Sequence, residues 1–98
     1  MSEDKLQDDI NRGQRATALL NDPLLKECIE GLIETYTREL FLTRPTEPQA
    51  REILYMAVNI AGKFRDHLAS FASNGKLAQR ELDMLIERKR VGRPPKAA

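Results

Sequence analysis

The residues of this 98-residue chain that could take part in acid–base or metal chemistry are few and widely separated. His67 is the only histidine and Cys28 is the only cysteine. One Cys and one His cannot form a structural zinc site, and no Ser, Cys and acid arrangement can be built around His67. We therefore interpret His67 as a structural residue, and expect no enzymatic activity, no metal and no cofactor.

The remaining polar clusters have simpler explanations. The carboxylates at Glu27, Glu30 and Glu34 follow a helical spacing that is typical of a solvated face. The five glycines are scattered, so they form no glycine-rich phosphate-binding loop. These residues indicate a soluble surface rather than a catalytic site.

The C-terminal segment has a charge opposite to that of the rest of the chain. Residues 88–98 read RKRVGRPPKAA and carry five positive charges and no negative ones. Residues 1–87 hold 11 Lys and Arg against 15 Asp and Glu, which leaves them at −4. Because an acidic body repels phosphate, any nucleic acid should bind to the C-terminal segment.

Residues 89–96, KRVGRPPK, resemble the AT-hook, a short peptide that binds the minor groove of A·T-rich DNA. In that family the glycine lets the backbone approach the groove floor, the proline keeps the chain extended, and arginines enter the groove. Val91 stands where the motif usually places a second arginine. The resemblance implies a DNA contact made by Lys89, Arg90, Gly92, Arg93, Pro94 and Lys96. Non-specific phosphate or RNA contact, and a plain solubilising or partner-binding tail, are the alternatives.

Composition favours one helical domain. Aromatic residues make up 5% of the chain, Trp is absent and charged residues make up 32%, which suits helices packed on helices. A single cysteine excludes an intramolecular disulfide and favours a reducing compartment. The longest apolar stretch, residues 53–62, is too short to span a bilayer, and the acidic start lacks the order of a signal peptide. We therefore expect a soluble, cytoplasmic protein that makes no membrane contact.

Capping and proline signals divide the chain into segments. Residues 1–12 are acidic with little to bury, so we expect a disordered or weakly helical lead-in. A short helix should cover residues 14–20, after which Asp22 caps a second helix that begins at Pro23. Apolar residues then recur every three or four positions, as expected for one helix face: Leu25, Ile29, Leu32, Tyr36 and Leu40.

The strongest helical pattern follows Pro45 and should run from about residue 46 to 73. Asn74 and Gly75 are typical of a helix end, and a last helix is expected over residues 76–89. The inward face of the longer helix is predicted to hold Ile53, Ala57, Ile60, Phe64, Leu68 and Phe71. The sequence thus predicts an all-α fold, with a single helical domain over residues 13–88 and a basic flexible tail over residues 89–98. Its architecture is an antiparallel helical hairpin with a shorter helix at each end.

So narrow a bundle leaves some apolar side chains without a partner within the chain. Leu24, Met56 and Val58 are the candidates for an interaction surface. Uncovered apolar positions favour self-association or binding to a larger protein assembly.

A second resemblance concerns the body of the chain. Residues 14–25, QRATALLNDPLL, and residues 74–78, NGKLA, resemble small helical proteins that bacteriophages and prophages encode near their head and packaging genes. The resemblance implies a phage setting and a binding or assembly role. Our main hypothesis is a non-enzymatic protein that oligomerises or docks on a larger complex, in head assembly or DNA packaging. The alternatives are a DNA-binding accessory or regulatory protein that uses the basic tail, and a small inhibitor of a host protein.

Overall fold

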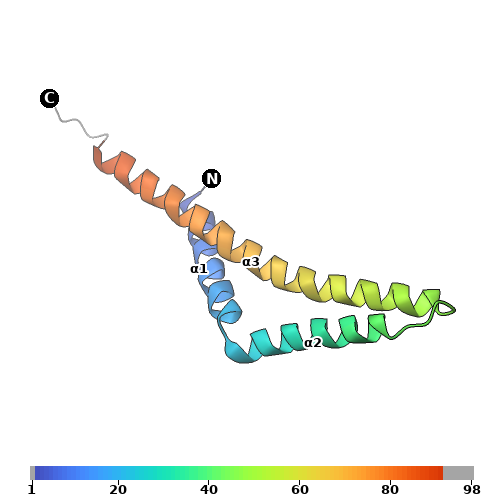
Figure 1. The fold of residues 1–98 in the computed structure, drawn as a ribbon. Helices are drawn as coiled ribbons and strands as arrows, with labels where there is room; N and C mark the ends of the chain where they lie inside the picture. Colours follow the sequence, from blue (N-terminus) through green and yellow to red (C-terminus); the bar gives the residue numbers. More distant parts are fainter. Residues whose placement is uncertain (1, 92–98) are drawn as a thin grey trace.

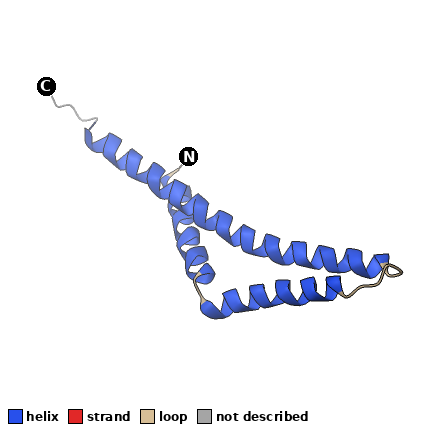
Figure 2. Ribbon diagram, viewed as in Figure 1, coloured by secondary structure: helices blue, strands red, loops and turns tan. Residues whose placement is uncertain are grey.

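Three helices account for nearly all of residues 2–91, the part of the chain that the computed structural model describes (Figure 2). They are α1 (Glu3–Leu20), α2 (Pro23–Phe41) and α3 (Pro48–Val91). α1 packs along the C-terminal half of α3 and α2 along its N-terminal half, whereas α1 and α2 barely touch each other (Figure 1). The all-α prediction is confirmed.

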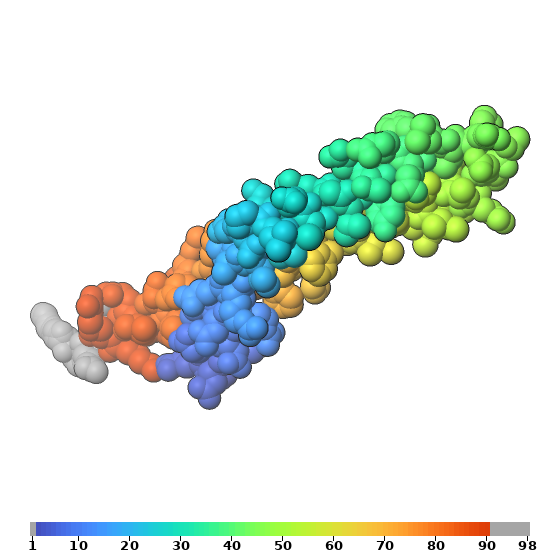
Figure 3. Space-filling model, turned by 90° about the horizontal axis from the view of Figure 1, so that it is seen from below, coloured from blue at the N-terminus to red at the C-terminus, as the bar shows by residue number. Residues whose placement is uncertain are grey.

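The molecule is a rod rather than a globule. Its principal extents are 78 × 25 × 20 Å and its radius of gyration is 21.6 Å, against about 13 Å for a compact domain of this length. The space-filling view shows α1 and α2 following one another along α3 (Figure 3). The predicted hairpin is confirmed, because α2 and α3 are joined by a short connection and lie side by side. The predicted shorter helix at each end is wrong at the C-terminus, where a single helix of 44 residues replaces two.

Residues 3–12 are not the predicted disordered or weakly helical lead-in, because they form the first half of α1, which begins at Glu3. Ser2 caps the helix, its Oγ accepting a hydrogen bond from the Lys5 amide at 3.1 Å. Leu6 and Ile10 lie one turn apart and are among the most buried side chains of the described chain. They pack with Ala78, Leu82 and Leu85 of α3. Two apolar residues are enough to order this segment because a partner helix covers them.

The predicted helix end at Asn74 and Gly75 is wrong for a related reason. Gly75 is buried in the middle of α3, opposite Gly13 of α1. A Cβ atom placed on Gly13 would lie 2.7 Å from the Gly75 Cα, closer than atoms can approach. The two glycines therefore let the backbones of α1 and α3 meet, and Gly75 serves helix packing rather than helix termination.

The start of α2 agrees with the sequence. Asp22 is the N-cap, and its Oδ1 accepts hydrogen bonds from the amides of Leu24 and Leu25 at 2.8 and 3.1 Å. Pro23 occupies the first turn, where no amide hydrogen is needed. The cap also redirects the chain, so that α2 leaves α1 and continues along α3.

Removal of this cap should weaken the fold measurably. We expect Asp22→Ala to lower the free energy of unfolding by about 1 kcal/mol, because two helix amides lose their acceptor. Asp22→Asn should retain most of the stability, because Asn caps helices equally well. Asp66→Ala is the control, since the Asp66 carboxylate forms no hydrogen bond or salt bridge within residues 2–91. Urea unfolding followed by circular dichroism measures all three, and equal losses for Asp22→Ala and Asp66→Ala would contradict the role of the cap.

Candidate protein-interaction surface

A single apolar stripe runs along α3, and only part of it is covered. Its members recur at intervals of three, four or seven residues, which keeps them on one side of the helix: Ile53, Ile60, Phe64, Phe71, Ala78, Leu82 and Leu85. α1 packs on the C-terminal part of this stripe. In the N-terminal part, Ile60 and Phe64 are 65% and 52% exposed. The prediction that Ile53, Ile60 and Phe64 face the core is therefore wrong.

The reason is that α2 packs beside the stripe instead of on it. The partly buried residues in this half of α3 include Leu54 and Ala61, about a quarter turn around the helix from Ile53, and Val58, which lies further around in the same direction. Val58, predicted to be uncovered, thus belongs to the covered side. The length of the stripe could have indicated that part of it is exposed. The stripe extends over 33 residues, and α1, with 18 residues, is too short to cover all of it.

An apolar groove of about 500 Å³ lies between α2 and this uncovered part of the stripe. Its floor includes the small residues Ala57 and Ala61 of α3 and the buried Ile29 of α2. Four exposed side chains form its rims, Cys28 and Leu32 on α2 and Ile60 and Phe64 on α3. Leu25 and Tyr36 complete the lining. We call these nine residues the open groove.

The two other predicted interaction residues lie near this groove but do not line it. Leu24 of α2 and Met56 of α3 are both exposed. Leu24 is one turn before Cys28, and Met56 is one turn before Ile60. They extend the exposed apolar area beyond the two rims, and their role in binding stays a prediction.

His67 lies at the boundary between the covered and uncovered parts of the stripe. It is exposed, and its ring contacts Phe71 edge to face, with 5.1 Å between the ring centroids. The guanidinium of Arg12 lies 5.8 Å from the centre of the same Phe71 ring, so this aromatic residue joins α1 to α3. The Ser70 hydroxyl donates a hydrogen bond to the backbone carbonyl of His67 at 2.7 Å and not to its ring.

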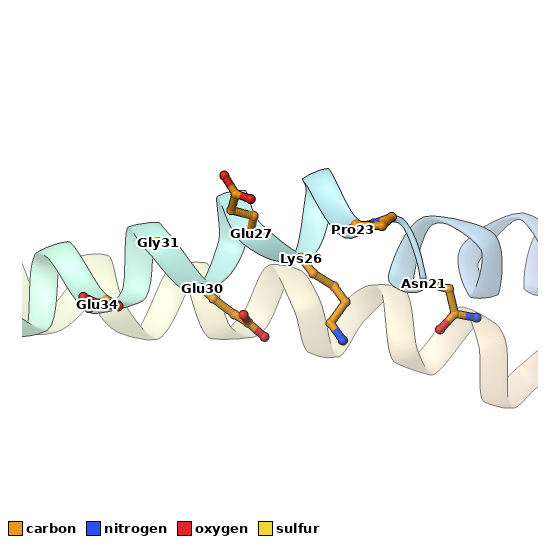
Figure 4. A pocket seen from close by; sticks show the side chains of 7 residues that line it. All are labelled: Asn21, Pro23, Lys26, Glu27, Glu30, Gly31 and Glu34. Atoms are coloured by element: carbon orange, nitrogen blue, oxygen red, sulfur yellow. The ribbon is translucent and has the colours of Figure 1, made fainter.

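A second hollow, on the acidic side of α2, is open and polar. It is lined by Glu27, Glu30 and Glu34 together with Lys26, Asn21, Pro23 and Gly31. Figure 4 shows Glu27 and Lys26 directed to opposite sides of α2, so these charges do not converge on one point. Glu34 is paired with Arg38 at 2.7 Å. Within residues 2–91, no group of three His, Cys, Asp or Glu side chains could hold a metal ion.

Only two of the six predicted DNA-contacting residues fall in the described chain. Lys89 and Arg90 belong to the last turn of α3 and not to an extended tail, so the predicted start of the tail at residue 89 is wrong. Lys89 forms a salt bridge with Glu3 of α1, and Arg90 forms one with Glu87 at 3.0 Å. Gly92, Arg93, Pro94 and Lys96 lie outside the described residues. DNA binding by this segment stays a prediction.

None of the helices in residues 2–91 combines the length and the apolarity that crossing a membrane requires. No protein-family model matches the chain, and neither a curated protein nor a solved structure is significantly similar to it.

Proposed function

We propose that this chain is a non-enzymatic interaction protein that joins a protein assembly through the open groove and the apolar residues around it. The observation that carries the proposal is the exposure of Leu32, Ile60 and Phe64 on the two rims of one groove. Scattered apolar residues are ordinary on a protein surface, but a contiguous apolar patch marks a site of association.

The shape of the molecule supports the same function. A rod with a radius of gyration of 21.6 Å keeps much of its apolar side-chain area on the surface. A second protein that covered the groove would bury that area, at about 25 cal/mol for each Å² removed from water. A binding partner therefore supplies the stabilisation that the single chain lacks on this side.

The resemblance to small helical phage proteins gives the proposal a setting. Residues 14–25 and 74–78 support a place near phage head or packaging functions. In that setting the protein acts as an assembly or packaging accessory, and its groove holds it in the complex.

Site-specific photo-crosslinking tests whether a protein covers this face. A photoreactive phenylalanine analogue is placed at Phe64, on the groove rim, or at Met84, which is equally exposed on α3 but lies off the stripe. In cells that carry the gene in its natural setting, we expect a crosslinked product from position 64 and none from position 84. No product from position 64, or the same products from both positions, would contradict the proposal.

A further inference from the structure

We propose that the open groove is occupied by a second copy of this chain, in an antiparallel two-fold dimer that sets two α2–α3 hairpins face to face. The inference rests on the proposed function, because it names the partner of the same surface. A two-fold contact uses one patch twice, so the patch has to be complementary to itself.

The groove and its rim meet that condition. Ala57 and Ala61 leave a hollow on the floor, and Ile60 and Phe64 project beside it from the same helix. In a face-to-face dimer, the Ile60 and Phe64 side chains of one chain enter the hollow of the other, in the way that large side chains fill holes between packed helices. A single helical hairpin thus provides both the projecting residues and the hollow that receives them.

The packing within the chain shows that this stripe binds helices. The C-terminal part of the stripe is covered by α1, through Leu6, Ile10 and the contact of Gly13 with Gly75. The open groove begins where α1 ends, and the same stripe continues into it. A helix from a second copy placed on Ile60 and Phe64 would continue a helix–helix contact that the chain already makes.

The order of large and small residues selects the antiparallel orientation. In a parallel two-fold dimer each residue lies level with its own copy, so Ile60 would meet Ile60 and Phe64 would meet Phe64. In an antiparallel dimer whose axis passes between residues 60 and 61, Phe64 lies level with the partner's Ala57 and Ile60 lies level with the partner's Ala61. Each large side chain then faces a small one.

Sedimentation equilibrium of the full chain, over a range of protein concentrations, tests the dimer. We expect a mass of twice the 11.2 kDa of one chain. Ile60→Asp should weaken the dimer roughly 100-fold or more, because each copy buries an unpaired carboxylate. Met84→Asp, at a position of similar exposure off the stripe, should leave the dimer unchanged. Circular dichroism should show unaltered helix content in both variants, since both side chains are exposed in the single chain.

An exchange of large and small residues tests the orientation. Ala57→Phe alone sets a phenylalanine at position 57 against the partner's Phe64 twice, and should weaken the dimer roughly 5- to 100-fold. The double variant, Ala57→Phe with Phe64→Ala, again sets a large side chain against a small one and should recover most of the affinity. Weakening by Ile60→Asp without recovery in the double variant would overturn the antiparallel arrangement.

The outcomes also separate this inference from the proposed function. A chain that stays monomeric, or a dimer that Ile60→Asp leaves intact, overturns the self-association through this groove. If position 64 then forms crosslinks only with a different protein, the interaction function stands and its partner is not a second copy. If position 64 forms no crosslink and the chain is monomeric, both proposals fail.

Discussion

Gly13→Ala is expected to lower the free energy of unfolding by about 2 kcal/mol, because the added methyl group meets backbone atoms that cannot move aside. A Cβ atom at Gly13 would lie 2.7 Å from the Gly75 Cα and 2.9 Å from the Phe71 carbonyl oxygen. The gain of about 1 kcal/mol that Ala normally brings to a helix interior is smaller than this steric cost. Gly75→Ala should behave in the same way, since its Cβ would lie 2.8 Å from the Gly13 Cα.

The matched control is the same substitution at a helical glycine with free space around it. A Cβ atom at Gly31 or at Gly62 meets nothing within 4 Å. Gly31→Ala and Gly62→Ala should therefore raise the free energy of unfolding by about 0.5 to 1 kcal/mol each. Urea unfolding at one fixed protein concentration compares the four variants, because self-association would make the apparent stability depend on concentration. A stabilising effect of Gly13→Ala would show that α1 and α3 do not meet at the two glycines.

The second large effect is expected at the contact between the start of α1 and the end of α3. Leu6 is 1% exposed and packs with Ala78, Leu82 and Leu85. Leu6→Ala should lower the free energy of unfolding by about 3 kcal/mol, because it removes apolar contacts and leaves a cavity. We expect α1 to pack less firmly on α3, since Ile10 is then the one buried apolar side chain left in the N-terminal half of this helix.

Hydrogen exchange locates this effect in the molecule. In Leu6→Ala, the amides of α1 should exchange faster than those of α2, which packs on the other half of α3. Leu19→Ala is the control, because Leu19 lies on the same helix and is 47% exposed; it should cost less than about 1 kcal/mol. Equal effects of the two substitutions would mean that Leu6 does not hold α1 in place.

The starts of α1 and α2 show how far capping residues allow a helix start to be predicted from the sequence. The Asp22 cap followed by Pro23 was predicted, and the Asp22 carboxylate accepts the two amide hydrogen bonds that the cap requires. A cap depends only on residues within one helical turn, so it can be read without knowledge of the fold. The Ser2 cap of α1 has the same local chemistry. It was not predicted, because the acidic composition of residues 1–12 favoured disorder over a helix.

The candidate site was only half predictable. The spacing of Leu32, Ile60 and Phe64 correctly indicates positions on apolar helix faces. Periodicity gives the direction of a side chain relative to its own helix, but it does not state which neighbour covers that direction. The exposed groove therefore emerged only when α1 and α2 were placed on α3, one on the stripe and the other beside it.

By itself, the sequence determined the helical class, the break between α1 and α2, and the apolar stripe of α3, because each depends on residues close together in the chain. The tertiary structure alone decided that Asn74 and Gly75 continue a helix, and that residues 3–12 are ordered. Gly75 is compatible both with a helix end and with close helix packing, and the choice depends on Gly13, which is 62 residues away. The physical reason is that a contact between distant segments contributes as much free energy as a helix cap. Such a contact cannot be recognised from the residues that are neighbours in the sequence.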